Sequence, residues 1–495
     1  MTEDRIPSGE PGMTVDLPPV PGRICGPRLW FWRMVIALAA LLGFAQPWLG
    51  PDTGSLESSS AGGLAVFEIQ ARLLVGVDYL LRQMPTAARG QAETDLQKSL
   101  ETLAKEVRSD RSTLAVAALQ GWLAAESGTA QAVALIDARL KVPVADDDPM
   151  RPVLRLGRHL LASGEPASPE DAALLEKNLG WFATLLISRT DDAVRQQLGK
   201  ACLPGALISL SVPVVVVLFG LLGLVLILVA IVGHNAGRFR FALPQSQALD
   251  LSDETQARFE LVFTQAFAAY LTIMVVFNLP FFDTFGLGFA LAGLFGAFLA
   301  GLFLPRFRGL PWGETRRLLG WHRGAGLLKE LGCGITGYFA MLPVLAIGVA
   351  ATLLLMGLAG LVAGSGGDSS GTGPVGPSAP VHPIVFQVAH GGWGVKIAIL
   401  FLATVLAPLF EETMFRGFFY RVLRRRHAFL LSGLVSGFLF AMVHPQGWIA
   451  IPALASIGFS LAGIREWRDS LIASMTAHAL NNGLVISLLF VVFGN

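Results

Sequence analysis

Long apolar runs dominate this 495-residue chain from Pro204 to its end. An apolar helix rises about 1.5 Å per residue, so about 20 residues cross the roughly 30 Å hydrocarbon layer of a membrane. One such run begins at Met34 and ends near Leu49. Further runs lie at about 205–232, 259–281, 285–305, 334–363, 393–420, 429–446, 447–464 and 470–492. The sequence therefore predicts an all-α polytopic membrane protein with about nine transmembrane helices.

The charge pattern predicts how these spans are oriented. Only 15% of the residues are charged, against about 25% in soluble domains, and the net charge of +1 gives no sign of a nucleic-acid partner. Basic residues gather at 306–329, 421–426 and 465–468. A nine-span topology with a cytoplasmic N-terminus puts all three on the cytoplasmic side, as the positive-inside rule requires. We therefore expect a multi-pass protein of the cytoplasmic (inner) cell membrane, with the lipid bilayer as its surroundings.

Changes in composition divide the chain. Residues 1–33 are rich in Pro, Gly and charge and are predicted to be a disordered cytoplasmic tail. Residues 34–50 follow several arginines and are predicted to be an uncleaved signal-anchor helix, because Gln46-Pro47-Trp48 is a poor cleavage site. The other expected divisions are an extracytoplasmic helical insert at 51–203, transmembrane helices and loops at 204–392, and a C-terminal core at 393–495.

The insert differs from the rest of the chain. It is charged, rich in Ala and Leu, and shows apolar residues at helical spacing in 93–107, 112–127 and 129–140. Ser168 and Pro169 are typical of an N-cap followed by a first helical position. We expect several short antiparallel helices; a tetratricopeptide-like repeat is the less favoured alternative, since no consensus period is found. The insert and an almost uncharged linker at 364–380 fall on the extracytoplasmic side, where the insert offers a surface for a protein partner.

Three polar clusters interrupt the last apolar spans, at 411–416, 440–444 and 478–482. Ionisable groups inside a membrane are costly, so chains that keep them generally use them or pair them. These clusters supply two adjacent carboxylates, an arginine, two histidines and an asparagine. Such side chains can activate a water molecule and stabilise an oxyanion. The sequence therefore indicates an intramembrane hydrolase.

Helical spacing favours contacts within and between these clusters. Glu412 and Arg416 are four residues apart and share a helix face, whereas Glu411 is rotated from them by about 100°. Counting residues from the cytoplasmic ends puts Glu411 and His444 at similar depth. His478 lies nearer the surface by this count, unless its helix starts deeper or tilts.

A structural interpretation is the alternative for each cluster. Glu412 and Arg416 would then be a buried ion pair, and the histidines would be hydrogen-bonded core residues. For one cluster alone the two interpretations are about equal, but three clusters on successive spans favour the functional one. In that interpretation Glu411 takes a proton from a water molecule that His444 helps to hold, and His478 and Asn482 donate to the oxyanion.

The ordered series Glu-Glu-x-x-x-Arg, Phe-x-x-x-His and His-x-x-x-Asn resembles the CPBP family, which groups type II CAAX prenyl proteases with bacteriocin-processing proteins. The resemblance covers about residues 390–495 and leaves out the insert. It implies a protease that hydrolyses a peptide bond of a membrane-associated peptide or protein. The residues that carry over are Glu411 as the water-activating glutamate, Glu412 and Arg416 as its motif partners, His444 from the second motif, and His478 and Asn482 from the third.

A metal ion is the open question for the chemistry. Glu411, His444 and His478 together could bind Zn²⁺, as three-ligand catalytic zinc sites do. The chain lacks a His-Glu-x-x-His helix, which is the strongest sequence signal of a metalloprotease. A metal-free mechanism is slightly favoured, because His478 and Asn482 are better oxyanion donors when they do not ligate a metal.

Two other classes of function compete with the protease. The first is a non-catalytic, protease-like scaffold or regulator that binds partners through the insert. Its phenotype would survive loss of Glu411 and fail when the insert is deleted. The second is a proton- or ion-coupled transporter, which also uses buried carboxylates and histidines. A transporter predicts internal repeat symmetry and helices broken at mid-membrane, and the sequence shows neither clearly.

Overall fold

The computed structural model describes residues 27–49, 64–85, 89–107, 109–123, 125–143, 148–237, 241, 253–277, 286–364 and 384–493. Within these ranges the regular elements are helices, and no strand occurs among the described residues. The prediction of an all-α polytopic membrane protein is confirmed. Most of the predicted tail, residues 1–26, and the linker after Gly364 lie outside the described residues.

The apolar helices follow the expected order along the chain. Among the described residues, six helices are long and apolar enough to cross a membrane, and three shorter apolar helices lie at Phe31–Gly43, Leu291–Phe307 and Phe429–Met442. Each expected span therefore overlaps a helix, although the last of these shorter helices ends at Met442, and the number of nine membrane crossings stays a prediction. The uninterrupted helices are α1 (Pro27–Leu49), α10 (Asp192–Asn235), α12 (Asp253–Phe277), α13 (Gly286–Phe307), α15 (Leu327–Gly364), α20 (Phe429–Met442), α21 (Ile451–Arg468) and α22 (Leu471–Phe493).

Helix α1 begins within the segment that was predicted to be a disordered tail. That prediction ended at residue 33, but the helix starts at Pro27. Proline fits the first turn of a helix, because the N–H that it lacks has no partner there in any case. The buried side chain of Phe31 stacks on Phe419, with ring centroids 6.4 Å apart.

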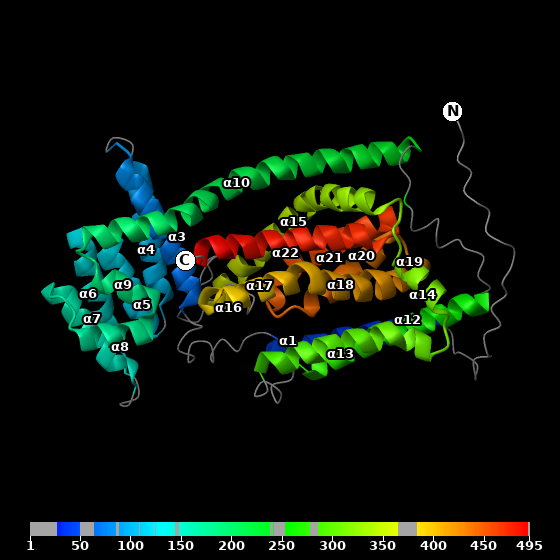
Figure 1. Ribbon diagram of the computed structural model, residues 1–495, viewed down its shortest axis with the longest axis horizontal. Helices are drawn as coiled ribbons and strands as arrows, with labels where there is room; N and C mark the ends of the chain where they lie inside the picture. The colour runs from blue at the N-terminus through cyan, green and yellow to red at the C-terminus, as the bar shows by residue number, and fades with distance from the viewer. Residues whose placement is uncertain are drawn as a thin grey trace.

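The span at 393–426 is one continuous rod built from five pieces. They are α17 (Trp393–Phe401), the π-helical η3 (Leu402–Leu406), α18 (Ala407–Glu411), the π-helical η4 (Glu412–Phe419) and α19 (Tyr420–Arg426). Figure 1 shows this rod beside α20, α21 and α22, with α1, α12 and α13 on one side and α15 and α10 on the other. The rod is therefore surrounded by neighbouring helices where η4 lies.

The insert is a cluster of helices at one end of the bundle (Figure 1). Its own apolar core includes Trp122, Leu154 and Phe182, which are almost fully buried. Ser168 caps α8 by accepting a hydrogen bond from the backbone N–H of Asp171, as its sequence position predicted. The insert helices are α3 (Ala65–Gln83), α4 (Gly90–Glu106), α5 (Asp110–Leu123), α6 (Ala125–Leu140), α7 (Met150–Ser163), α8 (Pro169–Leu179) and α9 (Trp181–Ile187).

Replacing Ser168 by alanine should loosen the first turn of α8. The cap satisfies a backbone N–H that otherwise has no partner in the helix, and such caps contribute about 1 kcal/mol. Hydrogen exchange of the amides in this turn should therefore quicken roughly fivefold. Ser99→Ala is the matched control, because Ser99 lies in mid-helix and donates to Asp95 O. Equal exchange in wild type and Ser168→Ala would show that the cap contributes nothing.

Helix α10 joins the insert to the membrane bundle without a break. It runs for 44 residues and passes through Pro204, where the sequence placed the start of a division. Its first turns pack in the insert, where an added Cβ on Gly199 would meet the Tyr79 ring at 2.3 Å. Its later turns carry exposed apolar side chains such as Leu218 and Val229.

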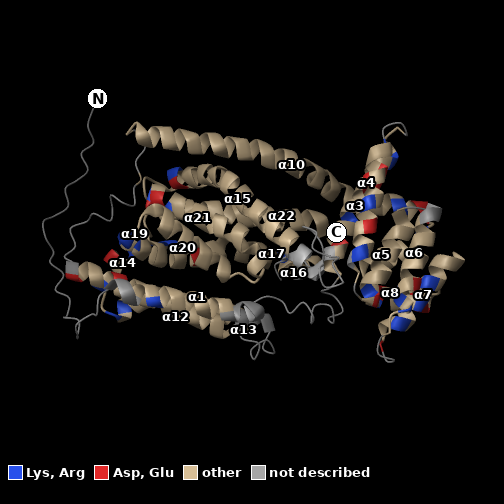
Figure 2. Cartoon of the chain, turned by 180° about the vertical axis from the view of Figure 1, so that it is seen from behind, with Lys and Arg blue, Asp and Glu red and all other residues tan. Residues whose placement is uncertain are grey.

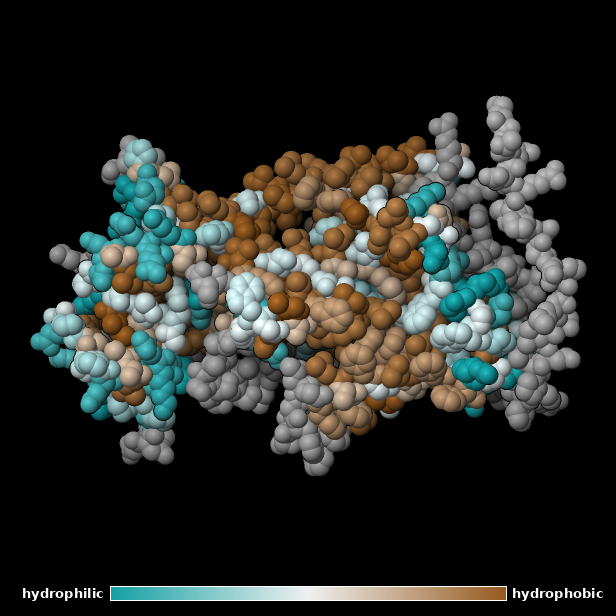
Figure 3. Space-filling model, in the orientation of Figure 1, coloured by the Kyte–Doolittle hydropathy of each residue, from teal (hydrophilic) through white to brown (hydrophobic). Residues whose placement is uncertain are grey.

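The three basic segments meet at the end of the bundle opposite the insert, which we call the arginine-rich end. It contains α14 (Trp312–Leu319), the loop after it, α19 and the turn at Asp469. Arg465 Nη2 donates to Leu319 O at 3.2 Å, and Arg421 lies 3.6 Å from Asp469. The three segments therefore lie at one end of the bundle, and their cytoplasmic location stays a prediction. Charged residues gather at this end and on the insert (Figure 2), and apolar surface fills the space between them (Figure 3).

Candidate active site

The π-helical segment η4 carries the first polar cluster. Glu411 is the last residue of α18 and Glu412 the first of η4, and every residue of η4 is buried. Aromatic packing against α12 holds the segment: Phe267 lies 4.4 Å from Phe419 and 5.2 Å from Phe415, measured between ring centroids. π-Helical turns inside α-helices are rare and are frequent at functional sites.

Glu412 and Arg416 form a fully buried ion pair. Arg416 Nη1 donates to Glu412 Oε1 at 2.8 Å, and both side chains have an exposed fraction of 0%. Arg416 Nη2 donates to the backbone oxygen of Gly458 on α21 at 2.9 Å. The guanidinium also lies 4.5 Å from the centroid of the Phe440 ring. The pairing expected from helical spacing is thus observed, and it connects η4 to both α20 and α21.

His478 lies between the two carboxylates. Its Nδ1 is 3.0 Å from Glu412 Oε1, and its Nε2 is 3.8 Å from Glu411 Oε2. Because a carboxylate only accepts hydrogen bonds, Nδ1 carries the proton when the imidazole is neutral, and Nε2 is then an acceptor. The first contact fixes the ring, and it presents Nε2 to Glu411.

His444 approaches Glu411 from the end of α20. Its Nδ1 is 2.7 Å from Phe440 O, and its Nε2 is 3.9 Å from Glu411 Oε2. The carbonyl again assigns the proton to Nδ1 in the neutral ring, so Nε2 faces the carboxylate as an acceptor. Glu411 Oε2 therefore has two imidazole Nε2 atoms within 4 Å, and neither distance is short enough for a direct hydrogen bond.

Exposure distinguishes the two glutamates. The side chains of Glu411 and His444 are 21% and 17% exposed, while those of Glu412 and His478 are 0% and 4% exposed. The accessible side of the cluster is therefore formed by Glu411 and His444. Glu412, Arg416 and His478 lie behind them and fix their surroundings.

The depth of His478 is explained by where α22 starts. The turn at Asp469 has a left-handed backbone with φ of 57°, and Ser470 is fully buried. Ser470 Oγ donates to His322 O at 2.8 Å, and Leu471 N donates to Gly320 O at 3.0 Å. Helix α22 thus begins inside the protein, which removes the mismatch in depth that residue counting predicted.

Asn482 lies one helical turn beyond His478 on α22. Its Nδ2 donates to Ala403 O on η3 at 3.0 Å, and its Oδ1 is 3.4 Å from Asn481 Nδ2. In this arrangement the amide joins α22 to the π-helical segment η3. Its donation to an oxyanion stays a prediction.

A catalytic zinc ion would require three protein ligands from this cluster. The Nε2 atoms of His444 and His478 both approach Glu411 Oε2. The Nδ1 atom of each imidazole is held by an acceptor, as it is in metal sites. However, the described part of the chain contains no group of three or more His, Cys, Asp or Glu side chains arranged to hold a metal ion. These residues therefore do not fit a metal site in the conformation described.

Comparison with known proteins assigns the segment that holds these residues. A family model of the type II CAAX prenyl endopeptidase Rce1-like kind matches residues 392–484. This segment belongs to the CPBP family. No curated protein and no solved structure matched the chain. The CPBP segment spans all three polar clusters, so the family that the sequence resembled is confirmed, and the segment is CAAX protease-like.

Sequence reasoning missed two partners of the CPBP residues. The first is Gly458 O, which accepts from Arg416; an added Cβ on Gly458 would lie 2.7 Å from Gly437 Cα. The small residues Gly433 and Gly437, four apart on α20, are the signal that could have revealed this close helix contact. The second is Trp321, whose Nε1 donates to Thr413 Oγ1 at 3.0 Å. No sequence signal relates these two positions.

Proposed function

We propose that the protein is an intramembrane endopeptidase in which Glu411 activates a water molecule for attack on a peptide bond. The observation that carries the proposal is the arrangement around Glu411 Oε2, with His444 Nε2 at 3.9 Å and His478 Nε2 at 3.8 Å. Separations of this size suit polar groups bridged by one water molecule. Glu411 Oε2 is itself buried and has no hydrogen-bond partner among the described residues, so such a water would supply the partner that it lacks.

Each proton has a place in this mechanism. In the resting site the water donates one hydrogen bond to His444 Nε2 and the other to Glu411, and Glu411 takes this second proton as the water oxygen bonds to the carbonyl carbon. The C–N bond then breaks, and Glu411 returns that proton to the leaving amine. His478 can donate from Nε2 to the oxyanion only while it carries a second proton, since Nδ1–H is directed at Glu412. Arg416 keeps Glu412 ionised as the partner of that Nδ1–H.

The substrate class follows from where the cluster lies. Glu411, Glu412 and Arg416 belong to a membrane-spanning rod, and the family comparison indicates a CAAX protease-type activity. We infer a membrane-associated peptide or protein as substrate. The test is a comparison of new protein termini in membranes of cells that carry wild type or the Glu411→Gln variant. Termini present only with wild type support the proposal; identical sets of termini contradict it.

The proposed mechanism routes no step through a metal. We therefore expect the purified protein to keep its peptidase activity after treatment with a chelator, and to contain well under one zinc ion per chain. Metal analysis and activity with and without chelator check this together. Stoichiometric zinc that is lost in the His444→Ala variant would replace the water-only mechanism with a zinc site built from the same three residues.

A further inference from the structure

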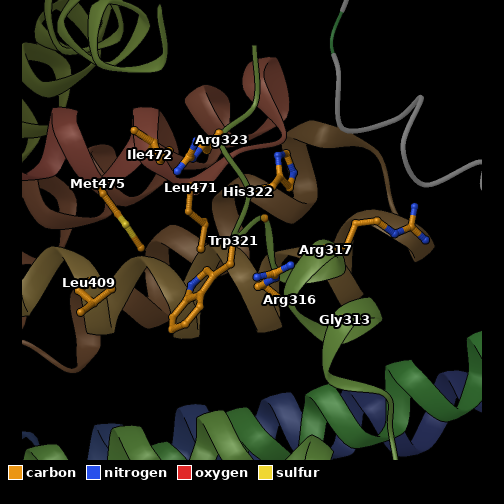
Figure 4. Close-up of a pocket in the computed structure, with 11 residues that line it drawn as sticks. Gly313, Arg316, Arg317, Trp321, His322, Arg323, Leu409, Leu471, Ile472 and Met475 are labelled. Atoms are coloured by element: carbon orange, nitrogen blue, oxygen red, sulfur yellow. The ribbon is translucent and has the colours of Figure 1, made fainter. Parts of the chain in front are cut away.

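A cavity lies at the arginine-rich end of the bundle. Its volume is about 820 Å³, and its walls come from α14, the loop 320–323, α18 and the first turns of α22. The cavity is separate from the open side of the Glu411 cluster, whose residues do not line it. Figure 4 shows the side chains that surround it.

The two ends of this cavity differ in polarity. Leu409 and Met475 lie toward one end, and Arg316 and Arg317 lie on the other side of Trp321 (Figure 4). Leu471 and Ile472 extend the apolar wall, and Arg323 lies beside Ile472 at its edge (Figure 4). One part of the cavity is therefore suited to hydrocarbon, and the other part is basic.

The positive charge of the basic part is largely unneutralised. Arg317 pairs with Glu314 at 2.7 Å, whereas no ion pair of Arg316 or Arg323 occurs among the described residues, and both are exposed. Burial lowers the pKa of His322 below its ordinary value, an effect that Asp469 only partly opposes. His322 is therefore neutral near pH 7, and the guanidinium groups supply the charge.

The arginine-rich end of the bundle has the character of a membrane interface. Phe307 is the last residue of α13 and Leu328 lies in the first turn of α15, and they are 82% and 83% exposed. Arg308 and Lys329 follow them directly in the sequence. Exposed apolar side chains alternating with basic ones are typical of the level where lipid headgroups lie. The arginine-rich end, which contains the cavity, therefore has the composition expected at the level of the phosphate groups of a bilayer.

We propose that this cavity binds an anionic phospholipid of the surrounding bilayer. The lipid phosphate lies against Arg316 and Arg323, and one acyl chain extends along Leu409, Ile472 and Met475. Guanidinium groups bind phosphate through paired N–H donors, and basic pockets between membrane helices are suited to anionic headgroups. A free phosphate ion would satisfy the arginines but leave the apolar part unfilled.

The bound acyl chain lies next to the turns that carry the proposed catalytic residues. Leu409 precedes Glu411 by two residues on α18, and Met475 precedes His478 by three on α22. Trp321, in the cavity wall, also donates its Nε1–H to Thr413 on η4 at 3.0 Å. Lipid binding thus stabilises the packing behind the site. This consequence rests on the proposed peptidase function, whereas the binding itself does not.

The test counts lipids retained by the purified full-length protein in native mass spectrometry. Wild type should keep one phosphatidylglycerol in preference to phosphatidylcholine, and the double variant Arg316→Gln/Arg323→Gln should lose it by at least about tenfold, because each guanidinium contributes a charge-assisted contact. The matched control is Arg306→Gln/Lys329→Gln, which removes the same charge from exposed positions outside the cavity. It should bind like wild type.

A further variant distinguishes the contribution of the apolar part of the cavity from that of the arginine charges. Ile472→Trp fills the apolar part and keeps every arginine, so it should also lose the lipid while remaining folded by circular dichroism. Equal retention of phosphatidylcholine, or equal loss in the control, would overturn the proposal in favour of general surface charge. Displacement of phosphatidylglycerol by inorganic phosphate alone, or by an acidic peptide, would overturn it in favour of those ligands. Peptidase activity is measured separately, so its absence does not affect this result.

Discussion

Glu411→Gln should reduce peptide cleavage by about 10²–10⁴-fold while the protein remains folded, since that is the range that a positioned general base contributes. The amide has nearly the shape of the carboxylate and can still contact both imidazoles, but it cannot accept the proton of the attacking water. Cleavage of a reporter peptide by the purified protein in lipid bilayers measures the effect. The kcat of the Glu411→Gln variant should fall by a much larger factor than the change in its KM.

Two further variants make this result specific. Glu411→Asp keeps a carboxylate at a shorter reach and should retain part of the activity. Glu176→Gln, an exposed carboxylate on α8 of the insert, should behave as wild type. Wild-type cleavage by folded Glu411→Gln would remove Glu411 from the chemistry and restore the scaffold interpretation, in which the insert carries the function.

Arg416→Met should lower the free energy of unfolding by about 3–5 kcal/mol, because removing one partner of a buried ion pair leaves the other charge uncompensated. Glu412 would keep its contact with His478 at 3.0 Å but lose its guanidinium partner, and the link from η4 to Gly458 O would be lost. Denaturant unfolding in detergent micelles measures the change. Activity should fall with it, because Glu411 directly precedes Glu412.

The double variant Glu412→Gln/Arg416→Met tests whether the uncompensated charge of Glu412 causes this destabilisation. It removes both charges, so it should be less destabilised than the sum of the two single changes. Arg306→Met, on the exposed surface, serves as the control for loss of an arginine and should change the unfolding free energy by no more than about 0.5 kcal/mol. Additive losses in the double variant would show that the two charges do not stabilise each other.

Local spacing predicted much of the fold and the contacts within single helices. Apolar runs of sufficient length located the spans, and the four-residue separation of Glu412 and Arg416 anticipated their ion pair. The same local rules placed Ser168 at a helix start. These features depend on residues close in sequence, so the pattern carries the information.

Contacts between segments far apart in the sequence could not be predicted from local spacing. The depth of His478 depends on Leu471 and Ser470 bonding to the backbone of Gly320 and His322, about 150 residues earlier in the chain. The π-helical segments η3 and η4 have no residue signature, since they arise from how the rod packs among its neighbours. The hydrogen bond from the Asn482 amide to Ala403 O also joins segments far apart in the sequence, and the donation of Asn482 to an oxyanion stays a prediction.

Helix α10 has a mechanical consequence. At 44 residues it is about 66 Å long, well beyond the 40–45 Å or so of a whole bilayer with its headgroups. Its first part is embedded in the insert, and its remainder lies along the bundle, where an added Cβ on Gly223 would lie 2.1 Å from Phe339 O on α15. No loop separates the two parts along this connection. A protein that binds the insert would therefore act on a transmembrane segment through one continuous helix, in which only Pro204 and Pro213 interrupt the backbone hydrogen bonding before the contact with α15.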